Sequence, residues 1–296
     1  MIKEIKVKSA LHKLKRKIPY GWDLNIYRGC GHGCCYCYAS YSHLYLDRAN
    51  DDNFHSDIYV KTNIIDQLEK ELRAASWKRD VINIGGVTDS YQPVEADYQI
   101  MPEILKLLIK YKTPAIISTK SNLILRDYDL IEQLSHLTYI NVAASITTGD
   151  EKIRQIIEPG AATTEARLAV LREFKKTKAS IGFHLMPILP HITDGMDNIK
   201  ELLLSALKCG VDYVLPGVLY LRGTSRAAFF SFLEREFPDL VEPYRLLYQK
   251  GGADKVYKAN LYRQINLYRD KFNVPKSYMK PMRDRLKPQE PSPRFK

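Results

Sequence analysis

The chain has 296 residues, of which 45% are hydrophobic and 27% charged, with a formal net charge of +11. This length allows one large α/β domain or two small ones, each with a sizeable core. The sequence has no run of eighteen apolar residues and no apolar stretch near the amino terminus, so we expect neither a membrane span nor a secretory signal and predict a cytoplasmic protein.

The positive charge is concentrated at the two ends of the chain. Residues 1–20 contain seven Lys or Arg and one Glu, and residues 250–296 contain thirteen Lys or Arg and four Asp or Glu. These ends predict either a surface that binds nucleic acid or solvated charge that keeps the protein soluble. The basic residues that would contact a nucleic acid are Lys13, Lys15, Arg16 and Lys17, together with those of a helix at 257–271.

Apolar runs alternate along the chain with amphipathic stretches of helical period. We expect strands at residues 23–29, 81–88, 115–120, 140–148, 180–189 and 213–221. We expect helices at residues 63–76, 99–111, 127–136, 164–177, 196–210 and 226–237. Six strand–helix units predict an α/β fold with a parallel sheet, either a partial (β/α)6, TIM-like barrel or a doubly wound sheet. In both, functional side chains gather at the carboxyl ends of the strands.

The patterns divide the chain into four segments. We expect a basic N-terminal segment at 1–22, the barrel at 23–237, a basic, Tyr-rich helical extension at 238–285 and a mobile, Pro-rich tail at 286–296. The extension is expected to wrap the barrel or cover its open edge.

Four of the five cysteines lie within "YRGCGHGCCYCYA", residues 27–39. Disulfides are disfavoured in a reducing compartment, which leaves a zinc site, a redox pair at Cys34 and Cys37, or an iron–sulfur cluster. Structural zinc sites often use two separated cysteine pairs, and the chain has no second pair, although His32 or His43 can serve as a ligand. The spacing of Cys30, Cys34 and Cys37 favours the cluster, because glycines 29, 31 and 33 let one loop curl around it.

Three thiolates leave one iron of a four-iron cluster without a protein ligand. An open metal position is where a substrate or cofactor binds, and a simple electron carrier has no need of one. The spacing therefore favours catalysis over electron transfer.

The CxxxCxxC loop after the first strand of a six-unit barrel resembles the radical S-adenosylmethionine (SAM) superfamily. The wider segment is similar to the branch that includes spore photoproduct lyase, and "TDSYQPVE", "STKSNLILRDYDLI", "SITT" and "EPGAATTEARL" fall where that branch has similar segments. The resemblance covers roughly residues 20–225. It implies a [4Fe–4S] cluster that binds SAM and reductively cleaves it to a 5′-deoxyadenosyl radical, which abstracts hydrogen from a substrate.

The resemblance also implies roles for individual residues. Cys30, Cys34 and Cys37 match the cluster ligands, whereas Cys35 does not match and is expected to pack. Lys120 matches a lysine that pairs with the SAM carboxylate, so it joins the three cysteines among the expected catalytic residues. The other residues expected to bind the cofactor are Tyr36, against the adenine, Gly85, Gly86, Thr88 and Asp89, near the amino group of SAM, and Ser118, Ser145, Arg167 and Met186. Glu158 is expected to pair with Arg167, either beside the cofactor or at the surface.

One position departs from the family. The lyase carries a hydrogen-donating cysteine whose place falls at Gly86, so repair of thymine dimers by its mechanism is not expected. Other residues able to quench a radical are Cys35, Cys209, Tyr38, Tyr91 and Tyr220, and spacing singles out none of them.

Three functions are compatible with these patterns. The favoured one is a radical SAM enzyme, of lyase or transferase type, that acts on an unidentified substrate; the basic ends and the resemblance to the lyase point towards nucleic acid. The second is a peptide- or protein-modifying radical SAM enzyme, although the C-terminal region lacks the cysteines of auxiliary clusters. The third is a non-enzymatic metal protein that binds nucleic acid. For either enzyme, the resemblance implies a reduced flavodoxin or ferredoxin as electron donor.

Overall fold

The computed structural model describes residues 1–15, 18, 20–46 and 53–286. Within them, a sheet of seven strands has the order β10-β9-β8-β7-β6-β3-β2. Its strands are β2 (Leu11–Lys13), β3 (Trp22–Leu24), β6 (Ile82–Ile84), β7 (Ala115–Thr119), β8 (Ile140–Ser145), β9 (Ser180–Ile188) and β10 (Tyr213–Val218). β3 and β6 to β10 run parallel, and β2 adds an antiparallel edge strand beside β3. The predicted strand at 81–88 ends at Ile84 because Gly85, with a φ of 86°, turns the chain.

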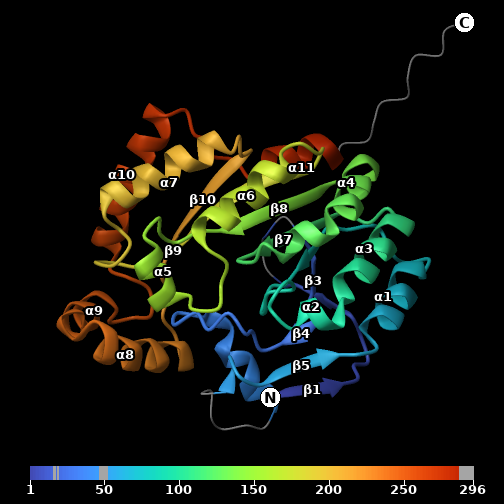
Figure 1. The fold of residues 1–296 in the computed structure, drawn as a ribbon, viewed down its shortest axis with the longest axis horizontal. Helices are drawn as coiled ribbons and strands as arrows, with labels where there is room; N and C mark the ends of the chain where they lie inside the picture. The colour runs from blue at the N-terminus through green and yellow to red at the C-terminus, as the bar shows by residue number, and fades with distance from the viewer. Residues whose placement is uncertain (16–17, 19, 47–52, 287–296) are drawn as a thin grey trace, which may run out of the picture.

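Helices cover the outer, convex side of this curved sheet (Figure 1). They are α1 (Ile64–Arg73), α3 (Ile100–Lys110), α4 (Tyr128–Leu137), α6 (Thr164–Phe174) and α7 (Met196–Lys208), and α8 (Thr224–Glu236) follows β10. In α1, Ile64, Leu68 and Leu72 recur every four residues and bury one helix face. The six predicted strand–helix units are therefore confirmed as a partial barrel whose two sheet edges do not meet.

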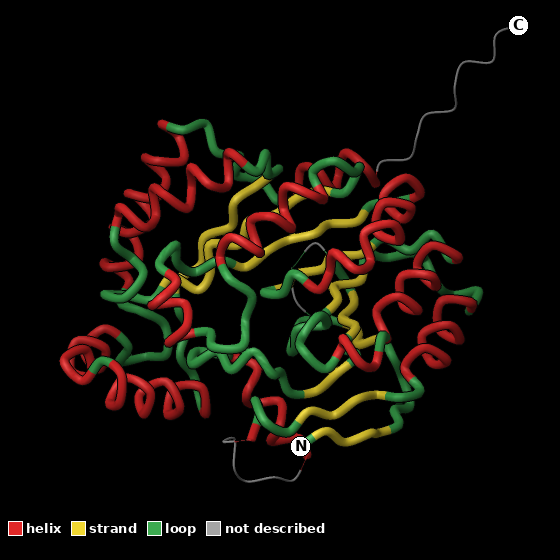
Figure 2. Tube along the Cα trace, viewed as in Figure 1, coloured by secondary structure: helices red, strands yellow, loops and turns green. Residues whose placement is uncertain are grey.

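A smaller sheet lies beside the barrel, at the bottom of Figure 2. It has the order β1-β5-β4 and comprises β1 (Ile2–Ile5), β4 (Tyr27–Arg28) and β5 (Ile58–Lys61). The segment predicted as strand 23–29 is thus split between β3, in the barrel, and β4, in this sheet. Short elements complete this part of the fold: η1 (Tyr38–Leu46), α2 (Glu95–Tyr98), η3 (Leu123–Asp127) and α5 (Glu151–Ile157).

The two faces of the main sheet differ in polarity. Ile82, Ile84 and Ile117 belong to the apolar core shared with the helices. Because successive side chains of a strand alternate, Asn83, Ser118 and neighbours such as His184 lie on the concave face. These polar residues are half-buried: Asn83 donates to Asp23 Oδ1 at 2.9 Å, and Ser118 Oγ lies 3.5 Å from His184 Nδ1. The inside of the barrel is therefore polar.

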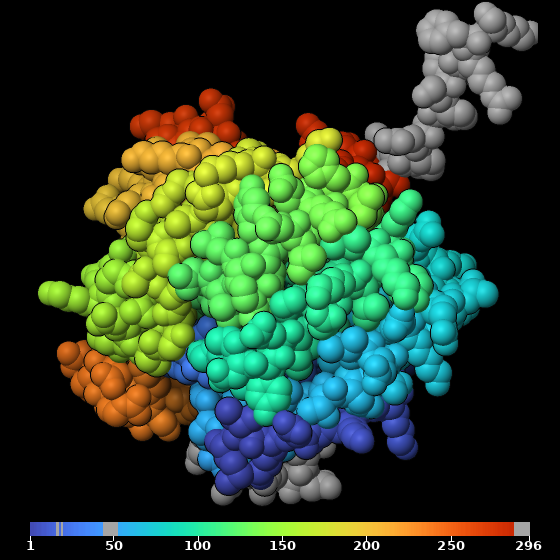
Figure 3. Space-filling model, turned by 45° about the vertical axis from the view of Figure 1, so that its right-hand side comes forward, coloured from blue at the N-terminus to red at the C-terminus, as the bar shows by residue number. Residues whose placement is uncertain are grey.

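The C-terminal extension covers the outer edge of β10, as predicted. It comprises η4 (Pro238–Leu240), α9 (Val241–Leu247), α10 (Lys255–Lys271) and α11 (Met279–Leu286). Val214 of β10 donates its N–H to the Pro275 carbonyl at 3.0 Å and accepts a bond from Arg269 through its own carbonyl, also at 3.0 Å. Figure 3 shows part of this extension in red, along the top of the molecule. The predicted tail lies outside the described residues except for Leu286.

Within the described residues, no helix has the length and apolar composition needed to cross a membrane.

Candidate functional site

The loop that carries the cysteines, residues 29–37, follows β4 and is fixed by buried polar side chains. Gln92 accepts a bond from the Gly31 N–H at 2.8 Å and donates to the Gly29 carbonyl at 3.1 Å. Thr88 donates to the same carbonyl at 2.6 Å. Gly29 has a φ of 83°, and a Cβ there would lie 2.4 Å from the Asp57 carbonyl oxygen, so only glycine fits. We call this segment the thiol loop.

His32 and Asp89 link the thiol loop to the ends of β6 and β7. His32 Nε2 lies 3.0 Å from Asp89 Oδ2, and its Nδ1 lies 3.0 Å from the Gly160 carbonyl oxygen. The Asp89 carboxylate also accepts bonds from the Thr119 hydroxyl and the Lys120 N–H. Burial alone would raise the pKa of Asp89, but His32 and the N–H donors lower it, so the carboxylate stays charged. Its contacts are thus structural, and its predicted binding of SAM stays a prediction.

A second segment, residues 157–162, lies against the thiol loop and is called the strap here. The Cys35 N–H donates to the Ile157 carbonyl at 3.0 Å, and the Gly160 N–H donates to the His32 carbonyl at 2.9 Å. A Cβ on Gly160 would lie 2.5 Å from the Gly31 carbonyl oxygen. The strap therefore lies so close to the thiol loop that position 160 has no room for a side chain.

Glu158 of the strap is the centre of a buried ionic network. Its carboxylate lies 2.7 Å from Arg167 Nη1 and 3.7 Å from Lys120 Nζ, and Glu158 and Arg167 are 0% and 1% exposed. It also accepts bonds from the hydroxyls of Tyr36 and Thr147. Burial would raise the pKa of Glu158, but the two cations and the hydroxyls outweigh it and lower this pKa to about 2. The Glu158–Arg167 pair is therefore internal and not a surface pair.

Lys120 connects this network to the thiols and to the inside of the barrel. Its ammonium lies over the Tyr36 ring, 5.8 Å from the centroid, and its charge opposes the rise in the pKa of Cys34. Burial, helped by the same charge, lowers the pKa of His184 to about 4, so His184 is a neutral imidazole at neutral pH. One half-buried cation thus acts on groups of the thiol loop, the strap and β9.

Cys30 and Cys34 are buried, Cys35 and Cys37 are half-buried, and none of the four forms a disulfide. Burial raises the pKa of Cys30 and Cys34 well above the usual range and that of Cys37 to about 12. The charge of bound metal is what makes such thiols ligate as thiolates. No three Cys, His, Asp or Glu side chains of the described chain converge on one ion. An iron–sulfur cluster does not require that, because its thiolates bind separate irons.

A buried donor beside these thiols also lacks a partner. Arg167 uses Nε and Nη1 on the carbonyls of Ala162 and Ser145, while Nη2 has no hydrogen-bond partner among the described residues. A cofactor oxygen bound there would satisfy it. The donor set and this orphaned N–H therefore fit a cluster with a polar ligand on it.

The remaining predicted residues lie at the same end of the barrel. Ser118 Oγ is 3.5 Å from His184 Nδ1, and Ser145, opposite His184 in the next strand, is half-buried. Met186 is half-buried near the end of β9, where it lies against Gly217. Gly85 and Gly86 form the turn after β6. The structure thus brings the predicted residues together, although their roles towards a cofactor stay predictions.

A side chain at Gly86, where the resemblance places the donor cysteine, would require the side chains of Asp23 and Asn83 to move. A Cβ on Gly86 would lie 2.8 Å from Asp23 Oδ2. Among the predicted radical quenchers, exposed Tyr38 donates its hydroxyl to the Gly86 carbonyl. Buried Tyr91 bonds to Asp127, and buried Cys209 donates to the Leu168 carbonyl. Of the predicted quenchers in the described chain, Tyr38 is therefore the one that forms a hydrogen bond with Gly86.

Sequence reasoning missed the support given by Gln92, His55 and Thr147 and the place of His184. His55 Nδ1 lies 2.9 Å from the Cys30 carbonyl oxygen, and His184 Nε2 lies 3.1 Å from the Tyr213 hydroxyl. The sequence does mark His184, because it is the single titratable residue in the apolar run "SIGFHLMPIL". Nothing in the sequence marks His55 as a neighbour of the thiol loop.

Comparison with known proteins decides the family. The sequence profile of the radical SAM superfamily matches residues 24–203, more than half of the chain. The chain belongs to the radical SAM superfamily. Membership implies an enzyme that uses SAM and an iron–sulfur cluster, and it confirms the resemblance seen in the thiol loop.

Relatives of this radical SAM protein occur in bacteria and archaea. An uncharacterized protein of Mycobacterium tuberculosis (strain ATCC 25618 / H37Rv) is 37% identical over 252 residues, which span 84% of this chain and 74% of that protein. An uncharacterized protein of Methanocaldococcus jannaschii is 28% identical over 242 residues, 81% of this chain and 86% of that protein.

Two solved structures show the same fold. Spore photoproduct lyase complexed with dinucleoside spore photoproduct matches with a TM-score of 0.68 and 15% identity, over 92% of this chain and 79% of that chain. Streptococcus suis SuiB bound to precursor peptide SuiA matches with a TM-score of 0.56 and 16% identity, over 88% of this chain and 48% of that chain. At these identities the likeness concerns the partial barrel alone.

Proposed function

We propose that this radical SAM protein is an enzyme whose Cys30, Cys34 and Cys37 hold a [4Fe–4S] cluster. That cluster, when bound, would supply the electron for reductive cleavage of SAM, the chemistry that starts hydrogen abstraction from a substrate. The observation that supports the proposal most is the group of three thiols on one loop, two buried and one half-buried and none in a disulfide, beside the ionic network of Glu158.

The chain's own residues orient the cofactor and exclude water. Lys120 is a half-buried cation above Tyr36, which suits a partner of the SAM carboxylate. Arg167 offers its free Nη2 to a cofactor oxygen, and Glu158 keeps Arg167 in place. Gln92, Thr88 and the His32–Asp89 pair fix the thiol loop, so that the ligand geometry is set before the cofactor binds.

We propose nucleic acid as the substrate. Support comes from the basic ends of the chain and from the fold shared with spore photoproduct lyase, which was solved with a dinucleoside photoproduct. Arg16 and Lys17 lie outside the described residues, so the N-terminal basic run rests on Lys13 and Lys15. The tyrosines of α10 support packing and not nucleic-acid contact, since Tyr257 bonds to Asp194 and Tyr262 to the Val218 N–H.

The glycine at position 86 has no thiol to donate hydrogen, which argues that the hydrogen transfer differs from that of the lyase. A reduced flavodoxin or ferredoxin is the proposed electron donor. The proposed chemistry needs reduced thiols, which is consistent with a cytoplasmic location.

A peptide-modifying radical SAM enzyme is the second candidate. The shared fold with SuiB, solved with a precursor peptide, favours it. The basic ends of the chain favour nucleic acid over peptide. Comparing hydrogen transfer to the SAM-derived fragment from oligonucleotide mixtures and from peptide mixtures distinguishes the two substrates.

Reductive cleavage of SAM tests the proposed function. Protein purified without oxygen should be brown and should release 5′-deoxyadenosine from SAM after reduction, as measured by liquid chromatography. Cys30→Ala, Cys34→Ala and Cys37→Ala should each abolish release, whereas Cys35→Ala is the matched control and should retain it. Colourless, zinc-loaded protein, or loss of activity in Cys35→Ala with retention in Cys34→Ala, would overturn the proposal.

A further inference from the structure

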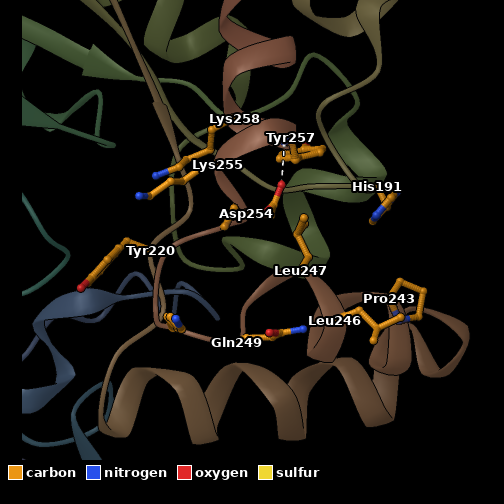
Figure 4. Close-up of a pocket in the computed structure, with 13 residues that line it drawn as sticks. His191, Tyr220, Pro243, Leu246, Leu247, Gln249, Asp254, Lys255, Tyr257 and Lys258 are labelled. Carbon is orange, nitrogen blue, oxygen red and sulfur yellow. Dashed lines mark hydrogen bonds between the residues drawn. The ribbon is translucent and has the colours of Figure 1, made fainter.

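A hollow of about 930 Å³ opens on the C-terminal extension, next to the carboxyl ends of β9 and β10. His191 follows β9 and Tyr220 follows β10, while the end of α9 and the start of α10 form the opposite wall (Figure 4). A second hollow of about 400 Å³ adjoins it and shares Tyr220, Gln249 and Lys250. We call the two together the α9–α10 hollow.

The α9–α10 hollow is lined by cations that lack ion-pair partners. Lys250, Lys255, Lys258 and Arg222 form no salt bridge with any residue that the structure describes. Among its described lining residues, the single acid is Asp254, whose carboxylate accepts the N–H groups of Val256 and Tyr257 at the start of α10. In Figure 4 the ammonium ends of Lys255 and Lys258 point towards the side on which Tyr220 lies. The hollow therefore has an uncompensated positive charge, which suits an anion.

Tyr220 supplies an aromatic face at the rim. Its side chain is 54% exposed, although its backbone is held by a bridge to Gly252 and the next residue, Leu221, donates to the Gly251 carbonyl at 2.8 Å. A Cβ on Gly252 would lie 3.5 Å from the Tyr220 ring and 3.7 Å from Lys258 Nζ. Gly252 thus lies between an aromatic ring and a free ammonium.

The floor of the α9–α10 hollow is joined to the thiol loop. Cys34 and Tyr36 belong to the same apolar cluster as Leu219, Leu221 and Tyr248. Tyr248 also donates its hydroxyl to the Leu219 carbonyl at 3.0 Å. A ligand in the hollow would therefore lie beside the end of the barrel where the cofactor is proposed to bind.

We propose that the α9–α10 hollow binds single-stranded nucleic acid, with a base stacked on Tyr220 and phosphates paired with Lys250, Lys255 and Lys258. Exposed aromatics between free cations are the elements that bind single strands without regard to sequence. The inference deepens the proposed function, because it gives the nucleic-acid substrate a binding site outside the barrel.

Fluorescence anisotropy of a labelled oligo(dT) strand tests this site on the full-length protein carrying its cluster. The variant Lys250→Gln/Lys255→Gln/Lys258→Gln should bind at least about tenfold more weakly, and its slope of log affinity against log salt should fall by about 2. The matched control, Lys70→Gln/Lys78→Gln/Lys178→Gln, removes the same charge from exposed positions outside the hollow and should bind within about twofold of wild type.

The aromatic face is tested separately. Tyr220→Leu should weaken binding about tenfold, whereas Tyr220→Phe keeps the ring and should stay within about twofold of wild type. Equal losses in the two triple variants would overturn the site. Thymidine 5′-monophosphate binding as tightly as the oligonucleotide would show a free-nucleotide site, and poly-glutamate competing equally well would show a site for acidic peptides. Either result would overturn the assignment to a nucleic-acid strand.

The same protein samples separate this inference from the proposed function. Release of 5′-deoxyadenosine without binding of oligo(dT) would overturn the hollow's role alone. Binding of oligo(dT) by a brown protein that never cleaves SAM would overturn the proposed function and leave the hollow intact.

Discussion

The protein places cations in two contrasting surroundings. At the thiol loop, Lys120 and Arg167 are largely withdrawn from solvent and share the carboxylate of Glu158. In the α9–α10 hollow, Lys250 and Lys255 stand exposed, with no acid paired to either among the described residues. The neighbours of Lys120 and Arg167 hold these two cations in place before a ligand binds. The charges of Lys250 and Lys255 are unpaired and can bind an anionic ligand.

Because of this difference, the buried cations are suited to orienting a ligand and the exposed cations to attracting one. A buried, hydrogen-bonded charge has a defined geometry and is little affected by salt, but removing its partner leaves it without compensation. Exposed cations contribute little to folding, attract anions over some distance and are screened by salt. The comparison therefore predicts opposite responses of stability in the two regions.

The largest effect is expected from Glu158→Gln. The change leaves Arg167 and Lys120 facing a neutral group in a buried site, and it should lower the free energy of unfolding by about 3–5 kcal/mol in urea titrations. The same substitution at the exposed Glu165, which pairs with Arg172, should cost no more than about 1 kcal/mol. Glu158→Gln/Arg167→Met should recover part of the loss, and a double variant no more stable than the single one would contradict this account.

A smaller, pH-dependent effect is expected from His184. Its pKa falls from 6.5 to about 4 on folding, so between these values the unfolded chain binds more protons and stability declines as the pH is lowered. His184→Gln should flatten this decline by about 2 kcal/mol in unfolding titrations from pH 7 to pH 4. The exposed His136 is the matched control, and His136→Gln should leave the slope unchanged. An equal change in both variants would argue against a buried, neutral His184.

The smallest effect on stability is expected in the hollow. Lys250→Gln/Lys255→Gln/Lys258→Gln should change the free energy of unfolding by no more than about 0.5 kcal/mol, because these lysines make no ion pair with a described residue. Urea titration in low salt is the measurement. A loss above about 2 kcal/mol would mean that these cations support the fold and would remove the contrast with Glu158.

Much of the barrel follows from sequence pattern. The parallel strands stand out as apolar runs because Ile, Val and Leu fill the face that packs on the helices, although polar side chains such as Asn83 and Ser118 lie on the concave face. The strands β1, β2 and β5 were not predicted. In β1, residues Ile2–Ile5 alternate between exposed and half-buried, and β2 has three residues of which two are exposed, so neither carries a clear apolar signal.

The site was predictable as a neighbourhood but not as a set of contacts. The topology places Lys120, Ser145 and the thiol loop at the same end of the barrel, independently of the contacts that their side chains make. The pairing of Glu158 with Lys120, or of His32 with Asp89, depends on distances between segments far apart in the chain, which no local pattern encodes. Tyr36 illustrates this limit, since its hydroxyl bonds to Glu158 and its predicted contact with adenine stays a prediction.

The bonds between β10 and the extension have a consequence for solubility. Val214 and Val218 of this edge strand donate their N–H groups to Pro275 and Tyr262. Unpaired edge strands act as templates for sheet formation between molecules. A chain truncated before α10 would therefore expose β10 to self-association and aggregation, even if every residue of the barrel kept its place.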